Sequence, residues 1–194
     1  MPTFDPRTAL LVVDVQNDFA DPAGALSVGG GSEVVAVANG AIERAHAAGA
    51  MVVYTQDWHP AHTPHFAQDG GVWPVHCVRD TWGAAFHREL VVDGEVIRKG
   101  TGGEDGYSAF SVRDPMSGAV SATLLEELLR DRGIDRVVVV GLATDYCVLE
   151  TVRDARMLGF GAEVLAEGIR AVDLHPGDGE RAIAQMRDAG AEVG

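Results

Sequence analysis

The sequence predicts an α/β fold: a single three-layer, Rossmann-like domain whose six-stranded, mostly parallel sheet carries helices on both faces. Continuous apolar runs, which are typical of strands buried on both faces, alternate with segments whose apolar residues recur at helical spacing. Strands that alternate with helices form βαβ units, which place parallel strands between two helical layers. The length of 194 residues, without a linker or an internal repeat, indicates one domain over residues 1–194.

The first half of the chain contains three expected strands and one expected helix. Ala9–Val15 is a continuous apolar run closed by polar residues, which suits a buried strand. In Ser32–Ala48 the apolar residues recur three and four positions apart, and Gly49 is a natural stop for this helix. Ala50–Thr55 is a second buried run. Glu95–Arg98 is expected to be a short third strand.

The second half continues the alternation. Leucines between positions 124 and 129 predict a helix with Ser121 or Thr123 as its cap and Gly133 after its end. Arg136–Leu142 is the clearest strand of the chain. The remaining expected elements are a helix at Val148–Ala155 that ends near Gly159, a strand at Ala162–Ala166, a helix at Asp178–Ala189 and a short strand at Ala191–Val193.

Charge and cysteine content restrict the function. Lys and Arg number 15 and Asp and Glu number 29, so the formal net charge is −14. Such an acidic chain argues against nucleic acid or an anionic membrane as partner and favours a neutral or cationic small molecule. Two cysteines do not form a disulfide scaffold, Met1–Thr8 has no apolar signal core, and no apolar run approaches the roughly 20 residues that span a bilayer. We therefore expect a reduced, cytoplasmic protein.

Two long irregular stretches, Asp57–Asp80 and Gly100–Gly118, indicate functional loops. In the first, Asp57 and His59 lie two residues apart, so an extended backbone points both side chains the same way. His62, His65 and His76 follow, and one carboxylate with several imidazoles can enclose a divalent transition metal. Solvated loop histidines are the alternative. Because Cys77 is the one thiol nearby, an open catalytic or substrate-binding metal site is favoured over a structural zinc site.

Cys147 follows the clearest strand at the expected start of a helix. A helix N-terminus lowers the pKa of a thiol and offers backbone N–H groups to an oxyanion, so Cys147 is the candidate nucleophile. A small buried core residue is the alternative. Asp14 and Lys99 also end strands, where Asp14 could take the thiol proton and Lys99 could keep Asp14 ionised. A structural ion pair between these two residues is the alternative.

Seven short motifs carry a family resemblance, and they span almost the whole chain. They are Leu11-Val-Val-Asp-Val-Gln-Asn-Asp-Phe19, Gln56-Asp-Trp-His-Pro60, His65-Phe66, Trp73-Pro-Val-His-Cys77, Arg98-Lys-Gly100, Tyr107-Ser-Ala-Phe110 and Val140-Gly-Leu-Ala-Thr-Asp-Tyr-Cys-Val148. In identity and order they resemble the isochorismatase-like cysteine hydrolases and, within them, the nicotinamidase (pyrazinamidase) branch. The family fold is a six-stranded parallel sheet flanked by helices, which agrees with the strands expected here.

The resemblance implies a role for each motif residue. It implies a catalytic triad of Asp14, Lys99 and Cys147, and a metal held by Asp57, His59 and His76 with His65 as a fourth ligand or close neighbour. It also implies that the substrate's pyridine ring lies between Phe19 and Trp73, with further substrate contacts from Leu142 and Ala143. The oxyanion hole would come from the N–H groups of Ala143 and Cys147, and the peptide between Leu142 and Ala143 would be cis. The Gly-rich stretch Thr101–Gly106 departs from the family pattern. His62 matches no family ligand and is expected to be a loop residue.

The implied reaction is the hydrolysis of nicotinamide, and of pyrazinamide as well, to the acid and ammonia through a thioester on Cys147. The cofactor would be one divalent transition metal ion, zinc, iron or manganese, that holds the pyridine nitrogen. Two alternatives remain: another amide or ureide hydrolase of the superfamily that uses the same triad without a metal, and a catalytically silent metal-binding module. The partner is a small pyridine carboxamide, with no nucleic acid or membrane, and the sequence leaves open whether the chain forms a homo-oligomer.

Overall fold

A computed structural model describes residues 2–194, and its central feature is one six-stranded sheet. The strand order is β3-β2-β1-β6-β7-β8, so the chain starts in the middle, builds to one edge and then builds the other. Every neighbouring pair is parallel, which confirms the predicted fold class. The strands are β1 (Thr8–Val13), β2 (Met51–Asp57), β3 (Glu95–Lys99), β6 (Arg136–Leu142), β7 (Gly161–Arg170) and β8 (Glu192–Val193).

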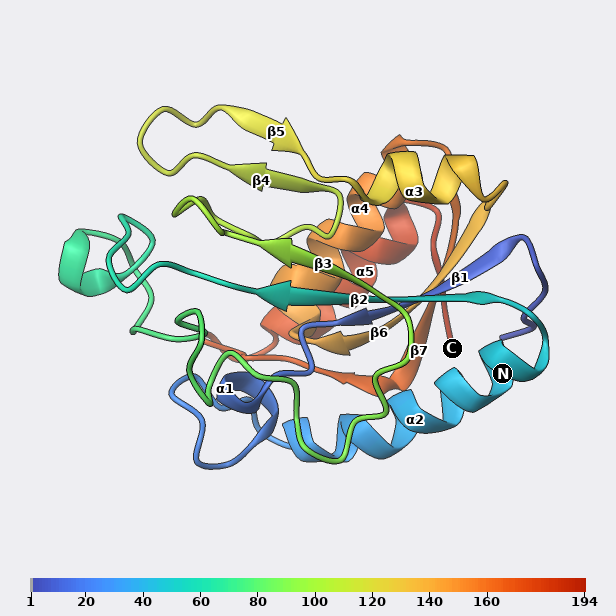
Figure 1. The fold of residues 1–194 in the computed structure, drawn as a ribbon, viewed down its shortest axis with the longest axis horizontal. Coiled ribbons are helices and arrows are strands. Elements are labelled where there is room, and N and C mark those ends of the chain that lie inside the picture. Colours follow the sequence, from blue (N-terminus) through green and yellow to red (C-terminus); the bar gives the residue numbers. More distant parts are fainter. Residues whose placement is uncertain (1) are drawn as a thin grey trace.

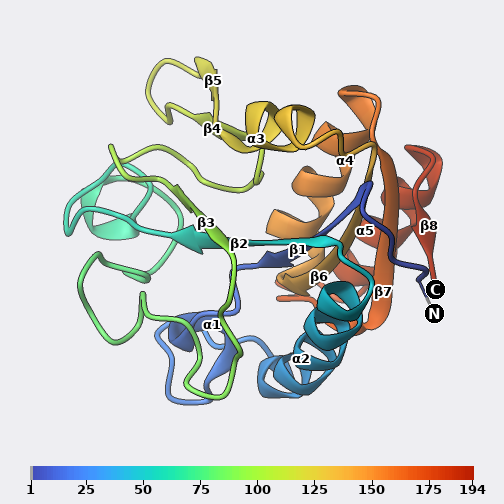
Figure 2. The ribbon, with the colours of Figure 1, turned by 45° about the vertical axis from the view of Figure 1, so that its right-hand side comes forward.

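Helices cover both faces of this sheet (Figures 1 and 2). One layer is the long helix α2, and the other contains three helices from the second half of the chain. Their bounds are α2 (Gly31–Ala47), α3 (Leu125–Asp131), α4 (Leu149–Met157) and α5 (Asp178–Asp188). None of the helices formed by residues 2–194 combines the length and apolar character needed to cross a bilayer.

The central strands are buried on both faces. In β1, Leu10 and Val12 belong to the core on the α2 side, whereas Leu11 and Val13 belong to the core under α3, α4 and α5. All of β1 and the run Val137–Val140 of β6 are buried. A strand with a helical layer on each face has no polar side, and this explains the continuous apolar runs in the sequence.

Most expected elements are present, with shifted ends. β1 ends at Val13 and not Val15, because Asp14 adopts a left-handed φ of 49° that takes the chain out of the strand. β2 continues past Thr55 because it pairs with β3 up to Asp57. β7 likewise continues to Arg170, beyond the expected end at Ala166.

The helix caps and the turn before α4 also differ from expectation. Leu124 is the residue that precedes α3, and Thr123 accepts a hydrogen bond of 3.2 Å from the Leu125 N–H, so Thr123 and not Ser121 assists the helix start. The expected helix at Val148 is preceded by a short π-helical turn, η2 (Thr144–Val148). Spacing of apolar residues cannot reveal such a turn, because its single irregular turn has no period of its own.

Four further short elements lie outside the expected set. α1 (Asn17–Ala20) and the 3-10 turn η1 (Ala67–Asp69) each have four residues or fewer. The stretch expected to be irregular at Gly100–Gly118 contains β4 (Ser111–Arg113), which pairs antiparallel with β5 (Val120–Ala122) in a separate two-stranded sheet. This hairpin lies away from the main sheet (Figure 1), and its short, largely exposed strands carry no apolar pattern that would predict them.

Candidate active site

The carboxyl ends of β1, β2, β3 and β6 meet at one edge of the sheet, on the left in Figure 1. Asp14 directly follows β1, Asp57 and Lys99 are the last residues of β2 and β3, and Cys147 lies in η2 directly after β6. The potential ligand atoms of Asp14, Asp57 and Cys147 lie within 4.8 Å of one another, and all three residues are buried. The structure therefore brings the expected triad together and adds Asp57 beside it.

Asp14 is held from two sides. Its Oδ2 lies 2.7 Å from the Lys99 Nζ, and its Oδ1 accepts a hydrogen bond of 2.6 Å from the Thr55 hydroxyl. Burial raises the pKa of the Asp14 carboxyl to about 6, although the charge of Lys99 opposes the shift. A carboxyl that titrates near neutral pH can accept a proton in one step and return it in the next.

Lys99 connects Asp14 to Asp57. Its Nζ lies 3.4 Å from the Asp57 Oδ1, and it also donates to the Gly106 carbonyl. Burial lowers the pKa of Lys99, but the two carboxylates outweigh burial and raise it above its usual value. Burial would raise the pKa of Asp57, yet Lys99 and the neighbouring imidazoles lower it. Lys99 and Asp57 are therefore both charged at neutral pH.

Cys147 differs from expectation in its acidity. Burial raises the pKa of its thiol well above the usual value, and the carboxylates of Asp14 and Asp57 raise it further against the opposing charge of Lys99. A helix N-terminus was expected to lower this pKa, but the buried, carboxylate-rich surroundings outweigh that effect. The resting thiol is thus protonated, and its proton must leave before or during nucleophilic attack.

The turn between β6 and η2 brings backbone close to the thiol. The peptide between Leu142 and Ala143 is cis, as the resemblance predicts. Gly141 has a φ of 133°, and a Cβ there would come within 2.0 Å of the Val13 carbonyl oxygen, so this position requires glycine. Ala143 and Cys147 line a pocket whose wall also includes Asp57, His65 and His76. The Leu142 side chain does not, because it points into the core shared with α2.

Aromatic side chains form the walls of the pocket next to Cys147. Phe19 from α1 and Trp73 from the long loop after β2 both line it, as expected. Tyr107 and Tyr146 add two aromatic walls that sequence reasoning missed. The Trp73 indole N–H donates to the Tyr107 hydroxyl at 2.7 Å, and the Tyr146 ring meets Trp73 edge-on at 4.8 Å. The cavity between these walls has a volume of about 30 Å³.

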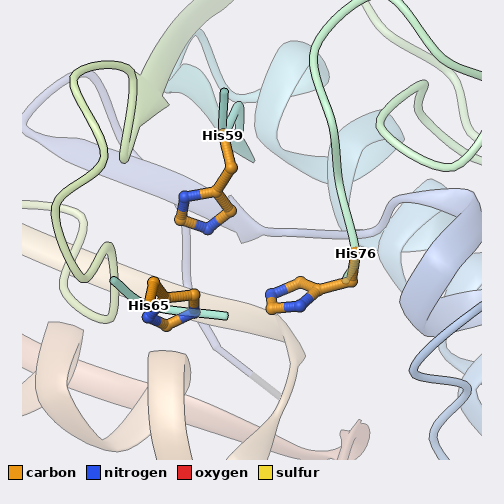
Figure 3. Close-up of side chains that lie close together, drawn as sticks. All are labelled: His59, His65 and His76. Carbon is orange, nitrogen blue, oxygen red and sulfur yellow. The ribbon is translucent and has the colours of Figure 1, made fainter. Parts of the chain in front are cut away.

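Three imidazoles converge beside this pocket (Figure 3). His59, His65 and His76 are each at least 96% buried, and one nitrogen from each lies within 4.8 Å of the others. The ring centroids of His59 and His65 are 4.7 Å apart, and the ring centroid of His76 lies 5.4 Å from each of them. His62 is not part of this cluster, because its exposed ring pairs with Asp69 at 3.2 Å.

Buried polar atoms without partners indicate that a cation belongs in this cluster. Both ring nitrogens of His59 are buried with no hydrogen-bond partner among residues 2–194, and the buried Asp57 Oδ1 faces the Lys99 ammonium at 3.4 Å without a hydrogen bond. Buried polar groups are nearly always paired, so the two unpaired nitrogens of His59 require an explanation. The Asp57 Oδ2 lies 3.8 Å from the His59 Nε2, so a carboxylate stands at the edge of the imidazole cluster. This donor set suits a divalent transition metal.

The other two imidazoles each have one nitrogen engaged by the protein. The His76 Nδ1 lies 2.8 Å from the Pro74 carbonyl oxygen, and the His65 Nδ1 lies 2.6 Å from the Asp105 Oδ1. Burial lowers the pKa of His76 to about 4, so its ring is neutral at pH 7. A neutral imidazole is the form that binds a metal.

The Gly-rich stretch Thr101–Gly106 and its neighbour Gly100 wrap around the cluster. A Cβ at Gly100 would lie 2.4 Å from the His59 ring, and a Cβ at Gly106 would lie 2.9 Å from the Asp57 Oδ1. Only backbone without side chains can approach these two residues so closely. Although this stretch departs from the family pattern, its backbone therefore still packs closely against His59 and Asp57 and forms one wall of the site.

Two further residues that sequence reasoning missed hold the backbone of the site. The Gln16 side chain donates to the Asp57 carbonyl and accepts from the Asp57 N–H, both at 2.8 Å. The buried Asp18 accepts from the Cys77 N–H at 2.7 Å, next to His76. Both belong to the motif that follows β1, but amides and carboxylates that bind backbone leave no signal of their partner in a single sequence.

Residues 8–194 match the model of the isochorismatase domain family. The chain is 41% identical to the nicotinamidase of Escherichia coli K12, over 97% of this chain and 94% of that protein.

Solved structures agree with this match. A pyrazinamidase of Pyrococcus horikoshii in complex with zinc is similar with a TM-score of 0.85 and 37% identity, over 97% of this chain and 99% of that chain. PnC1 from L. infantum in complex with nicotinate is similar with a TM-score of 0.88 and 35% identity, over 99% of this chain and 94% of that chain.

Proposed function

The chain belongs to the isochorismatase family, and we propose that within it the chain is a metal-dependent nicotinamidase that converts nicotinamide and water to nicotinate and ammonia. The single observation that carries this proposal is that Cys147 and two of the three clustered histidines, His65 and His76, line one pocket, with Asp14 beside the thiol and Lys99 paired with Asp14. The names of the similar proteins, a nicotinamidase, a pyrazinamidase with zinc and a structure with nicotinate, support the same substrate class. Pyrazinamide is accordingly a second substrate.

The pocket walls suit a flat, neutral heteroaromatic ring. Because a cavity of about 30 Å³ is too small for such a ring, we propose that Phe19 and Trp73 move apart to take the pyridine ring between them and direct its carboxamide towards Cys147. A divalent transition metal held by Asp57, His59, His65 and His76 would supply a Lewis acid for the pyridine nitrogen. Fixing the ring at both its faces and its nitrogen leaves the amide carbon over the sulfur, in the orientation that attack requires.

The first half of the reaction forms a thioester. The Cys147 sulfur attacks the amide carbon as Asp14 accepts the thiol proton, because the raised thiol pKa makes a separate base necessary. The backbone N–H groups of Ala143 and Cys147 would hold the resulting oxyanion. Asp14 then gives the proton to the amine, the C–N bond breaks and ammonia leaves.

The second half breaks the thioester. Asp14, ionised again, takes a proton from a water molecule as the water oxygen attacks the thioester carbon. The C–S bond breaks, the proton returns from Asp14 to the sulfur, and the carboxylic acid leaves as nicotinate once it has given its own proton to water. Lys99 stays charged throughout and stabilises the ionised state of Asp14 at a distance of 2.7 Å.

An assay of ammonia and nicotinate release from nicotinamide tests the proposal. It uses the purified chain as isolated, after metal removal and after reloading with zinc, iron or manganese, together with elemental analysis that identifies the native metal. Turnover that depends on the metal supports a nicotinamidase. Hydrolysis of other amides or ureides without metal would place the chain among the other amidases of the family, and no hydrolysis with bound metal would indicate a silent module.

We further propose a cytoplasmic location. The proposed nucleophile must remain a free thiol, and both Cys77 and Cys147 are free and buried. A reducing compartment keeps such thiols unmodified. Fractionation of cells that produce the tagged chain tests this location, and size-exclusion chromatography with light scattering measures whether the chain forms a homo-oligomer.

A further inference from the structure

The three clustered imidazoles differ in what holds them. His59 has no hydrogen-bond partner on its ring among residues 2–194, and the His76 Nδ1 faces a backbone carbonyl. Among these three rings, only that of His65 has a nitrogen within hydrogen-bond distance of a carboxylate: its Nδ1 lies 2.6 Å from the Asp105 Oδ1, whereas the His59 Nε2 lies 3.8 Å from the Asp57 Oδ2. An ionised carboxylate can only accept, so this contact requires the proton of His65 to be on Nδ1. The lone pair of its Nε2 is then free.

We propose that Asp105 is a positioning residue of the metal site, which fixes the tautomer and ring orientation of His65 so that Nε2 is a direct metal ligand. This inference rests on the metal-dependent function proposed above. A carboxylate that accepts from the second nitrogen of a ligand imidazole orients the ring and makes its free nitrogen more basic. Both effects strengthen binding of a cation between His59, His65 and His76.

The backbone around Asp105 is fixed independently of its side chain. Asp105 and Arg113 exchange two backbone hydrogen bonds, of 2.7 and 3.0 Å, which anchor the Gly-rich stretch to β4. The Thr63 hydroxyl, which accepts from the His65 N–H at 3.2 Å, also donates to the Gly103 carbonyl at 2.5 Å. The loop that carries His65 is therefore fastened to the stretch that carries Asp105, and removal of the Asp105 carboxylate leaves this frame in place.

Asp105 also stands between the two halves of the site. The next residue, Gly106, accepts a hydrogen bond from Lys99 through its carbonyl. One dipeptide thus contacts a metal-cluster imidazole through the Asp105 side chain and the triad lysine through the Gly106 backbone. The Asp105 side chain is only 18% exposed, so water screens its charge little and its interaction with His65 is correspondingly stronger.

The affinity of the full-length protein for Zn²⁺ tests the inference, by competition with a chromogenic chelator and without substrate. Asp105→Ala should bind Zn²⁺ about 10- to 100-fold more weakly than the unmodified chain. Asp105→Asn, whose amide oxygen can still accept the Nδ1–H bond, should lose less. The matched control is Asp69→Asn. It changes the same kind of carboxylate–imidazole pair, here with the exposed His62, and should leave the affinity for Zn²⁺ unchanged.

Nitrogen-15 NMR of the Zn²⁺-loaded protein gives a readout that a purely structural role would not move. His65 should carry its proton on Nδ1 in the unmodified chain, and the Nδ1–H signal should shift in Asp105→Asn. Unchanged Zn²⁺ affinity in both Asp105 variants, or a His65 proton on Nε2 in the unmodified chain, would overturn the inference. Absence of nicotinamide turnover by the unmodified, zinc-loaded chain is a separate outcome. It would contradict the proposed function, but the comparison of Zn²⁺ affinities would still decide the role of Asp105.

Discussion

Asp14 has an uncommon combination of properties for a carboxylate residue. It is fully buried, its φ of 49° lies in the left-handed region, and it directly follows the apolar run Ala9–Val13 of β1. Strained backbone of this kind persists where the surroundings enforce it, and it clusters at functional sites. Here Thr55 and Lys99 supply the partners that a buried carboxylate needs. The sequence indicated the anomaly of a charge after an apolar run, but not Thr55, because a threonine within a strand is unremarkable.

The pH dependence of the reaction should reflect Asp14. Only the ionised carboxylate can accept the thiol proton, and burial raises its pKa to about 6. The ratio kcat/KM for nicotinamide should therefore be constant above this pH and fall about tenfold per pH unit below it, with the sign of a base that must be deprotonated. Asp14→Asn should lower kcat by about 10²-fold or more. A variant with near-normal kcat, or a rate that rises as the pH falls below 6, would contradict this role.

The two cysteines should respond differently to substitution. Cys147 lines the pocket and lies beside Asp14, whereas Cys77 does not line it and burial raises the pKa of its thiol well above the usual value. Cys147→Ala should abolish nicotinamide turnover while the fold and the metal content persist. Cys77→Ala, the matched control, should keep substantial activity. The measurement is turnover together with circular dichroism and elemental analysis, and mass spectrometry should find the acyl group on Cys147 after rapid quenching.

At the scale of elements, sequence patterns predicted what the core enforces and missed what individual polar contacts enforce. Arg136–Leu142 has the same bounds in the sequence prediction and in the structure, because burial on both faces demands an unbroken apolar run. The hairpin of β4 and β5 was missed because its strands are short and largely exposed. Tyr107 and Tyr146 were missed as pocket walls for a related reason: a tyrosine in a loop or turn gives no sign of which cavity it faces.

The Gly-rich stretch after β3 shows how an element can be defined by what its residues lack. Gly100 has a left-handed φ of 67°, and the space where its Cβ would lie is occupied by the His59 ring. Gly100→Ala should therefore strain the backbone and displace His59, so the variant should lose both metal and nicotinamide turnover. Gly118→Ala is the matched control, since Gly118 has a similar φ of 72° but no neighbour within 4 Å of its Cβ position. Metal content of the two purified variants checks the prediction, and equal content in both would contradict it.

At the scale of the whole molecule, Lys99 links the proposed catalytic triad to the proposed metal site. Its ammonium contacts Asp14 of the proposed triad at 2.7 Å and Asp57 of the proposed metal site at 3.4 Å, with all three residues buried. The sheet topology produces this arrangement, because β1, β2 and β3 are adjacent and end at the same edge. The strongly acidic surface, with a net charge of −14, does not oppose a neutral substrate. A neutral pyridine carboxamide can therefore reach the site without electrostatic repulsion.

Removal of the metal should disrupt substrate binding without disrupting the rest of the molecule. The cluster of His59, His65 and His76 stands beside the triad, so its proposed task is to hold the pyridine nitrogen and not to provide the nucleophile. A strong chelator should therefore abolish nicotinamide turnover, and added Zn²⁺ should restore it. Benzamide, which lacks the ring nitrogen, should be a very poor substrate with or without metal. His76→Ala should lose metal and activity together, whereas His62→Ala, on an exposed ring, should lose neither. Full turnover of nicotinamide by a metal-free preparation would contradict this role, because the aromatic walls alone would then suffice to orient the amide over Cys147.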